Sequence, residues 1–201
     1  MSGATLIAIL AAGRASRFGG GKLDAPCAGK PLGNWAIEAV DAAGAPPGLI
    51  VVGPDAPSFT GIAMADGWAL VTNPEPEAGI GGSVALAARH AECLGADALV
   101  LLLADMPLID GAFIRQLLDG GSRDMPVAAR YPSGKPGVPA RFPAAMFADL
   151  SALSGDRGAA MLLAGRTGLL MIDPPAGSLL DVDDKEALAR AESALRQRPI
   201  G

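Results

Sequence analysis

The chain has few cysteine, histidine, aromatic and charged residues among its 201 positions. Its two cysteines, Cys27 and Cys93, fit no metal-binding spacing, and such isolated thiols are typical of a reducing, cytoplasmic setting. Its one histidine, His90, falls inside an expected helix, which favours a packing or surface role over catalysis. No apolar run approaches the length of a membrane span, and no basic residue precedes the first one, so we expect neither a membrane segment nor a signal peptide.

Net charge and composition narrow the class of protein further. The net charge of −5 argues against non-specific binding to nucleic acid, although it leaves room for one bound nucleotide. Half of the residues are hydrophobic, which excludes a disordered chain. A chain of this length can bury an ample core as one large domain, so we expect a single domain over residues 1–201 and a cytoplasmic protein.

Apolar runs of strand length alternate with helix-length segments along much of the chain. The runs are nearly continuous rather than alternating with polar residues, which is typical of strands in a parallel sheet that is covered on both faces. The order therefore predicts an α/β fold. The expected strands are Thr5–Leu10, Leu49–Val52, Ala69–Thr72, Ala98–Leu103 and Leu169–Ile172, and the longer expected helices are Leu32–Ala43, Ser83–Leu94, Asp110–Leu118 and Asp184–Arg196.

The stretch from about Met125 to Leu163 breaks this alternation. It contains a segment dense in proline and glycine, followed by two short expected helices, Ala144–Leu150 and Asp156–Leu163. An insertion of this kind late in an α/β chain is often a binding loop or a lid. We therefore expect an irregular substrate-binding segment here.

A glycine-rich, basic loop follows the first expected strand. Residues 10–22 have the sequence Leu-Ala-Ala-Gly-Arg-Ala-Ser-Arg-Phe-Gly-Gly-Gly-Lys. Backbone N–H groups beside glycines can converge on an anion, and arginine and lysine can neutralise its charge. The loop is not a Walker A motif, because Ser16 stands where that motif needs glycine and Leu23 follows Lys22. The dinucleotide-binding fingerprint is also absent, because no glycine at position 24 completes it from Gly19.

Three further segments place polar residues where strands end or helices begin. The sequence Gly-Ile-Gly-Gly-Ser at 79–83 opens a helix, where Ser83 can bond a ligand or act as a helix N-cap. Asp105 follows the most hydrophobic strand and precedes Pro107, so it is either a ligand-binding carboxylate or a turn residue. Asp183, three residues before Glu186, can bind a ligand or form a capping box with it.

The loop pattern Leu-Ala-Ala-Gly-x-x-x-Arg-Phe-Gly-x-x-Lys resembles the signature of the nucleoside-triphosphate transferase family. It is most similar to the MobA-like molybdenum-cofactor nucleotidyltransferases, in particular the branch that joins CTP to molybdopterin. The resemblance implies a Rossmann-like three-layer α/β/α fold with a mostly parallel, mixed sheet. It also implies a nucleotide-binding half over residues 1–107 and an acceptor-binding half over residues 108–201.

The resemblance further implies a role for individual residues. Lys22 and Arg17 would act in catalysis, on the α-phosphate and the outer phosphates respectively, together with Asp105. Asp105 and Asp183, with Asp181 as the second choice for the latter, would bind Mg²⁺. The nucleotide would contact Leu10, Ala11, Ala12, Gly13, Arg14, Lys22, Asn73, Gly81, Gly82 and Ser83. The acceptor would contact Gly137, Pro139 and Asp156, and Asp156 is alternatively a helix cap; Ala160 stands where relatives often carry arginine.

The expected reaction is Mg²⁺-dependent transfer of CMP from CTP to the phosphate of a molybdopterin-type acceptor, with release of pyrophosphate. The product could be handed to a molybdoenzyme or to its chaperone. GTP as the donor and a sugar or alcohol phosphate as the acceptor stay open, because backbone groups read the base. Two other classes also stay open: an NAD(P)H-dependent oxidoreductase and a non-catalytic carrier of nucleotide or cofactor.

Overall fold

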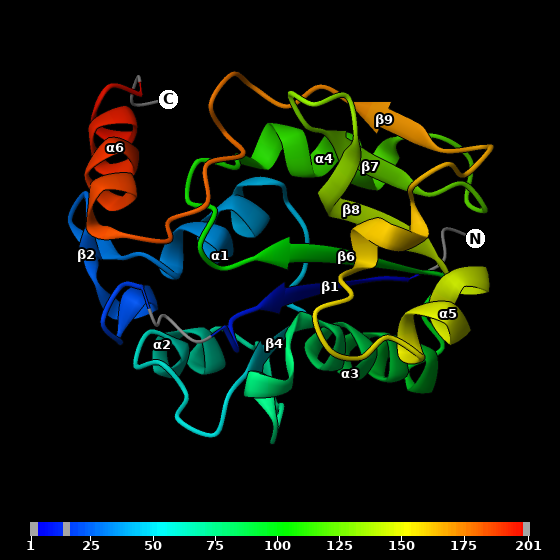
Figure 1. The fold of residues 1–201 in the computed structure, drawn as a ribbon, viewed down its shortest axis with the longest axis horizontal. Helices are drawn as coiled ribbons and strands as arrows, with labels where there is room; N and C mark the ends of the chain where they lie inside the picture. The colour runs from blue at the N-terminus through cyan, green and yellow to red at the C-terminus, as the bar shows by residue number, and fades with distance from the viewer. Residues whose placement is uncertain (1–3, 14–16, 199–201) are drawn as a thin grey trace.

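The computed structural model describes residues 4–13 and 17–198 and shows one seven-stranded sheet between two layers of helices (Figure 1). The sheet contains β1 (Thr5–Leu10), β4 (Leu49–Val52), β5 (Ala69–Thr72), β6 (Ala98–Leu103), β7 (Val127–Arg130), β8 (Pro136–Pro143) and β9 (Leu170–Ile172). The α-helices are α1 (Asn34–Ala42), α2 (Thr60–Ala65), α3 (Ile80–Cys93), α4 (Gly111–Asp119), α5 (Phe147–Ser151) and α6 (Lys185–Arg196). Short 3₁₀ turns are η1 (Lys22–Asp24), η2 (Pro76–Ala78), η3 (Ala144–Met146) and η4 (Ala159–Leu162), and β2 (Pro26–Cys27) pairs with β3 (Lys30–Pro31) in a small hairpin.

The strand order is β5-β4-β1-β6-β8-β7-β9. The pairs β5–β4, β4–β1, β1–β6 and β7–β9 are parallel, whereas β8 runs antiparallel to both of its neighbours. Six strands therefore end at one edge of the sheet, and only β8 ends at the other. The expected mostly parallel, mixed α/β sheet is confirmed, and ligands of such sheets bind at the carboxyl edge.

The strands β1, β4, β6 and β7 send alternate side chains into two separate cores. On β1, Ile7 and Ile9 join the core under α1, α4 and α6, while Ala8 and Leu10 join the core with α3 and α5. Figure 1 shows α1 and α4 on one side of the sheet and α3 and α5 on the other. Because both faces are buried, the strands are continuously apolar, as the sequence predicted. Among the described residues, no helix is long and apolar enough to cross a bilayer.

The segment after Met125 differs from its expected form. It is not an irregular insertion, because β7 and β8 are strands of the sheet and lie between β6 and the edge strand β9. Prolines disfavour a central strand, since they cannot donate to the ladder. In β8, Pro136 and Pro143 stand at the ends, and Pro139 lies where the β7–β8 register shifts. The expected helix over 156–163 is also wrong, because only the 3₁₀ turn η4 forms there.

Arg141 of β8 secures the connection between α4 and β7. The residue is 6% exposed, and its guanidinium donates hydrogen bonds of 2.6–3.2 Å to four carbonyl oxygens, those of Leu118, Gly120, Ser122 and Met125. A buried charge is tolerated only when such bonds replace its hydration. The planar fork of arginine suits several acceptors at once, so this residue orders a loop that has little apolar contact of its own.

Replacing this side chain by an apolar one of similar length is expected to destabilise the fold. Arg141→Met leaves four carbonyl oxygens without their donor and lowers the free energy of unfolding by about 2–3 kcal/mol. Urea denaturation followed by circular dichroism measures the change. The control is Arg89→Met, which removes one bond of 3.4 Å from an exposed side chain and should change stability little. Equal stability of the two variants would contradict the role of Arg141.

Candidate active site

The glycine-rich loop leaves β1 at the carboxyl edge of the sheet and returns to it at Lys22. Residues 11–13 continue the path of β1, and Ala11 N–H donates to the carbonyl of Val51 at 2.8 Å. Gly19, Gly20 and Gly21 have φ angles of 91°, 94° and 60°, a region that side chains make costly. These three residues turn the chain back so that Lys22 begins η1 with its side chain buried. The predicted nucleotide-binding residue Arg14 lies outside the described residues.

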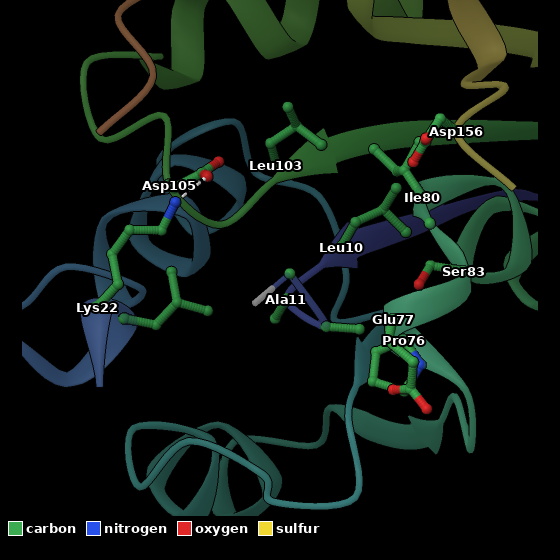
Figure 2. Close-up of a pocket in the computed structure, with 14 residues that line it drawn as sticks. Leu10, Ala11, Lys22, Pro76, Glu77, Ile80, Ser83, Leu103, Asp105 and Asp156 are labelled. Atoms are coloured by element: carbon green, nitrogen blue, oxygen red, sulfur yellow. Dashed lines mark hydrogen bonds and ion pairs between the residues drawn. The ribbon is translucent and has the colours of Figure 1, made fainter. Parts of the chain in front are cut away.

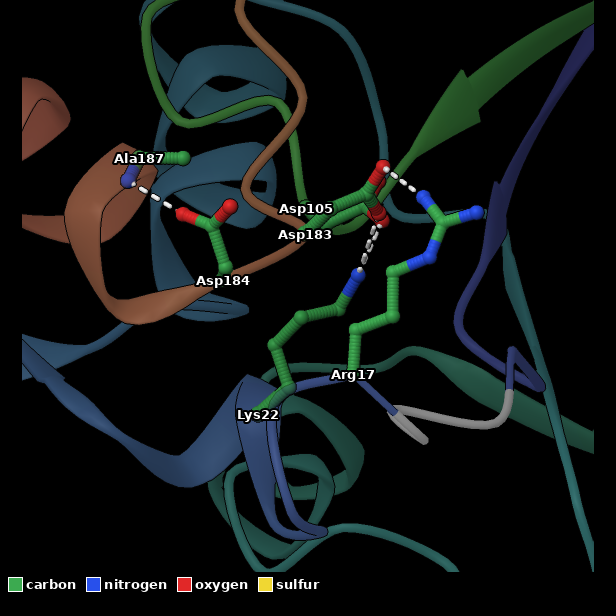
Figure 3. A network of polar contacts seen from close by, with 6 residues as sticks. All are labelled: Arg17, Lys22, Asp105, Asp183, Asp184 and Ala187. Carbon is green, nitrogen blue, oxygen red and sulfur yellow. Dashed lines mark hydrogen bonds and ion pairs between the residues drawn. The ribbon is translucent and has the colours of Figure 1, made fainter.

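Lys22 brings together the two predicted metal-binding carboxylates (Figure 3). Its Nζ donates to Asp105 Oδ2 at 2.6 Å and lies 3.6 Å from Asp183 Oδ1. The Lys22 side chain is 10% exposed and that of Asp105 is 24% exposed, so this contact is poorly hydrated. Arg17 reaches Asp183 from the solvent side, at 3.8 Å with a largely exposed side chain. Four charges from three distant segments of the chain therefore meet at one point.

Two backbone features position these carboxylates. Val182 is fully buried, and its N–H donates to the Asp105 carbonyl at 3.0 Å, which holds the segment 181–183 against the end of β6. Asp184, rather than Asp183, caps α6 by accepting from Ala187 N–H at 2.7 Å (Figure 3). The capping-box alternative for Asp183 is therefore wrong, and its carboxylate faces Lys22 and Arg17 instead.

Asp181 adds a third carboxylate to this region. Partial burial, together with the negative charges of Asp105 and Asp183, raises its pKa to about 6, and Lys22 opposes the increase. Burial makes the larger contribution to this increase, and the two neighbouring carboxylates add to it. Asp181 was only the second choice for a metal ligand, and the sequence alone did not show that it lies beside Asp105.

A pocket of about 320 Å³ opens beside this cluster (Figure 2). It is lined by the predicted nucleotide-binding residues Leu10, Ala11, Ala12, Gly13, Lys22 and Ser83, and also by Asp105 and Asp156. A second hollow of about 510 Å³ shares its wall at 11–13 and Lys22 and extends over Gly20 and Gly21 toward residues 53–57. The two hollows together form a continuous surface along the glycine-rich loop.

Asn73 holds the Ser83 hydroxyl at the wall of the pocket. Glu75 N–H donates to Asn73 Oδ1 at 3.1 Å, so the amide Nδ2 faces Ser83 and donates to its Oγ at 3.0 Å. Both side chains are buried, at 3% and 4% exposed. Because Ser83 Oγ accepts this bond, its own hydrogen stays available for a ligand. Ser83 lies in the first turn of α3, whose N-cap is Gly79, so the N-cap alternative is wrong.

The start of α3 is packed against residues 154–156. Gly81 N–H donates to the Gly155 carbonyl at 2.9 Å. A Cβ atom at Gly79 would lie 2.4 Å from Gly155, and one at Gly81 would lie 2.7 Å from Ser154. Only glycine permits this approach, which brings Asp156 to the rim of the pocket. Asp156 does not cap η4, whose N-cap is Gly158, so that alternative is wrong.

The other two predicted acceptor residues lie in the sheet rather than in a turn. Gly137 and Pro139 both belong to β8 and are buried. A Cβ atom at Gly137 would lie 2.4 Å from the ring of Tyr131, so this glycine lets the ring pack flat on the strand. Neither residue lines the pocket beside Lys22. Sequence reasoning missed Tyr131, the only tyrosine of the chain.

The carboxylates fit Mg²⁺ bound together with a nucleotide better than they fit a metal held by protein alone. Among residues 4–13 and 17–198, no three acidic, cysteine or histidine side chains gather in a way that could hold a metal ion. Mg²⁺ is often held by one or two carboxylates together with substrate phosphates and water. Asp105 and Asp183, which both contact one cation beside an open hollow, match that donor set.

Solved structures share this fold over almost the whole chain. A nucleotidyl transferase from Methanothermobacter superposes with a TM-score of 0.81 at 20% identity and covers 96% of this chain and 99% of that one. Rv0371c from Mycobacterium tuberculosis superposes with a TM-score of 0.72 at 25% identity over 96% of this chain and 99% of its own. Rv0371c has also been solved with manganese, and that structure matches with a TM-score of 0.71 at 23% identity, over 94% of this chain and 98% of its own.

Two curated relatives match in sequence. The purine catabolism protein PucB of Bacillus subtilis is 29% identical over 187 residues, which are 88% of this chain and 90% of PucB. The bifunctional protein GlmU of Agrobacterium fabrum is 34% identical over 114 residues, which are 56% of this chain and 25% of GlmU. Residues 7–169 match the MobA-like NTP transferase domain. The chain therefore belongs to the MobA-like NTP transferase family, and it is a nucleotidyltransferase.

Proposed function

We propose that this nucleotidyltransferase transfers CMP from CTP to the phosphate of a molybdopterin-type acceptor and releases pyrophosphate. The observation that carries the proposal is the placement of Lys22 between Asp105 and Asp183, at the mouth of a pocket that follows a glycine-rich loop. Apart from Asp156, the residues that line this pocket belong to 1–107, which we assign to the nucleotide, and we assign the acceptor to the half formed by residues 108–201. Of the two curated relatives, PucB matches this chain over 90% of its own length, whereas GlmU matches over 25% of its own.

The reaction needs charge neutralisation more than proton transfer. An oxygen of the acceptor phosphate forms a bond to the α-phosphorus in line with the leaving group, and the bond from the α-phosphorus to the bridging oxygen breaks. The electron pair of that bond leaves with pyrophosphate. The attacking phosphate is already anionic at neutral pH, so no general base is required. The protein's task is to position the two phosphates and to stabilise the charge that develops.

Lys22 is the buried cation closest to this chemistry, and we assign it to the α-phosphate. The side chain of Arg17 is largely exposed, and we assign it to the outer phosphates and the leaving pyrophosphate. Asp105 and Asp183 are the residues that would hold Mg²⁺. Bound there, Mg²⁺ supplies positive charge that lowers the repulsion between the donor and acceptor phosphates.

GTP as the donor and a sugar or alcohol phosphate as the acceptor remain the second candidate within the transferase class. The oxidoreductase alternative is not favoured, because the family match is to NTP transferases. A thermal-shift titration with CTP, GTP and NADPH, each with and without Mg²⁺, separates these candidates.

Removal of either half of the central ion pair is expected to abolish most turnover. Lys22→Ala and Asp105→Ala should each lower the rate of acceptor-dependent pyrophosphate release from CTP by about 10²–10³-fold, because charge that develops in the transition state loses its partner. Circular dichroism should show an intact fold. Lys30→Ala is the matched control, since Lys30 pairs with Glu38 and lies over Trp35. Near-normal rates in the first two variants would contradict the assignment.

Lys22 also competes with a divalent cation for Asp105 and Asp183 in the free enzyme. Lys22→Met should therefore bind Mn²⁺ about five- to tenfold more tightly than the natural protein when nucleotide is absent. The variant lacks the ion pairs of Lys22 with the carboxylates, which contribute about 1 kcal/mol and must be broken when the metal binds. Electron paramagnetic resonance of free Mn²⁺ measures the binding. Lys30→Met should leave the affinity unchanged, and Asp183→Asn should weaken it. If Lys22→Met binds Mn²⁺ no better, the carboxylates and the lysine do not share the metal site.

Substitutions in the Asn73–Ser83 pair should weaken the binding of the base of the nucleotide and leave the binding of its phosphates unchanged. Asn73→Asp keeps the shape of the side chain but replaces the amide nitrogen, which donates to Ser83, by a carboxylate oxygen, which accepts. The Ser83 hydroxyl then donates to position 73 and no longer donates into the pocket. This variant and Ser83→Ala should each bind CTP about three- to tenfold more weakly, the value of one hydrogen bond. Calorimetry with inorganic tripolyphosphate is the control, and its affinity should not change. Equal losses for both ligands would show general damage to the site.

A further inference from the structure

A pocket of about 400 Å³ lies at the edge of the sheet opposite the active site. Its walls come from the second half of α1, from the loop that leads into β4 and from the loop that leads into β5; we call it the acidic pocket. Because β4 and β5 run parallel to β1, the residues that precede them lie at the amino edge of the sheet, away from the glycine-rich loop. The residues that line the acidic pocket are different from those that line the two hollows of the active site.

Two helices end at the acidic pocket, and acidic residues stand at both ends. Glu38 and Asp41 lie in the second half of α1, and Asp66 is the C-cap of α2. The C-terminal end of a helix carries partial negative charge, so cations are favoured there and carboxylates are not. Neither helix has a basic residue in its last turn, although Arg115 of α4 donates to the Ala42 carbonyl at the end of α1. The pocket therefore concentrates negative charge that its own two helices do not neutralise.

Only one of the three carboxylates is paired with a basic side chain. Lys30 pairs with Glu38 at 2.5 Å. In the part of the chain that the structure describes, the side chains of Asp41 and Asp66 accept no hydrogen bond and form no ion pair. No three acidic side chains of these described residues lie close enough together to hold a metal ion. A cation that fits the pocket must therefore carry its charge on a larger, organic body.

Trp68 adds a second, independent feature to the lining of the pocket. The residue is 6% exposed and belongs to the core on the α1 side of the sheet, yet it lines the pocket. Its indole N–H donates to no acceptor among the described residues, whereas a buried indole N–H usually has a partner. Ile37, Val40 and Pro47 supply apolar surface beside it, and the face of an indole ring attracts organic cations. The pocket thus offers one unpartnered donor and apolar walls in addition to its carboxylates.

We propose that the acidic pocket binds a small organic ammonium ion of the amino-alcohol class. The ammonium group lies among the carboxylates of Asp41 and Asp66, the carbon chain contacts the apolar walls, and the oxygen accepts a hydrogen bond from the indole N–H of Trp68. A neutral alcohol would leave both carboxylates without a counter-charge, and a plain amine would leave the indole N–H without an acceptor. Because the pocket lies at the amino edge of the sheet, this ligand is distinct from the nucleotide and from its acceptor.

The test uses 3-amino-1-propanol as the probe and compares it with 1,3-propanediol and with propylamine at constant ionic strength. Trp35→Phe leaves Trp68 as the one tryptophan of the chain, so a change in fluorescence during the titration reports occupancy of the acidic pocket. The probe should bind at least about tenfold more tightly than the diol and about three- to tenfold more tightly than propylamine, the value of one hydrogen bond. Calorimetry on the natural protein makes the same comparison without the substitution of Trp35.

Substitutions of the same shape locate the charge that the probe recognises. Asp66→Asn should weaken the binding of 3-amino-1-propanol about three- to fivefold, and the double variant Asp41→Asn/Asp66→Asn should weaken it at least about tenfold. Asp149→Asn removes an exposed carboxylate from α5 and is the matched control, which should bind the probe as the natural protein does. Circular dichroism should show the same fold in all of these variants.

Three results would overturn the proposal. Equal binding of the diol and the probe would show that charge has no part in the site. Unchanged binding in the double variant, or an equal loss in Asp149→Asn, would show that the probe responds to the net charge of the protein and not to this pocket. Displacement of the probe by an equal concentration of Mg²⁺ would identify a metal site in place of an organic-cation site.

Discussion

The contact between Lys22 and Asp105 is the interaction on which the site depends. It joins the return of the glycine-rich loop to the end of β6, two segments that are 83 residues apart in the chain. Two opposite charges with little exposure stabilise each other only while both are in place, because either one alone would be buried without a partner. Asp183 extends the contact to the segment before α6, so that one lysine organises loops from the beginning, middle and end of the sequence.

In the proposed function, the same arrangement neutralises the site before substrate binds. Asp105 and Asp183, which we propose hold a divalent cation, are paired with Lys22 and Arg17 in the free protein. An anionic nucleotide would offer these two cations another partner. The surrounding backbone is held by packing, since Val182 is buried in the core and the start of α3 is packed on residues 154–156.

Much of the fold could be predicted because its strands are buried on both faces. The strands β1, β4, β5 and β6 have the predicted boundaries, and β9 differs by one residue. The strand β8 was missed because three prolines argue against a central strand, and only pairing with β6 and β7 on either side overrides that local preference. The capping role of Asp184 and the position of Ser83 inside α3 were missed because helix ends shift by a residue or two with little change in local pattern.

The sequence by itself determined the class of fold, the glycine-rich loop and the chemical types of its partners, because continuous apolar runs, glycines and isolated acidic residues are local signals. Only the tertiary structure decided which of these residues meet. Lys22, Asp105 and Asp183 converge because parallel strands bring their carboxyl ends to one edge, and Tyr131 reaches the same edge through β7. Strand order is set by long-range pairing that leaves no trace in the spacing of residues, which is why the meeting of these charges could not be predicted from the sequence.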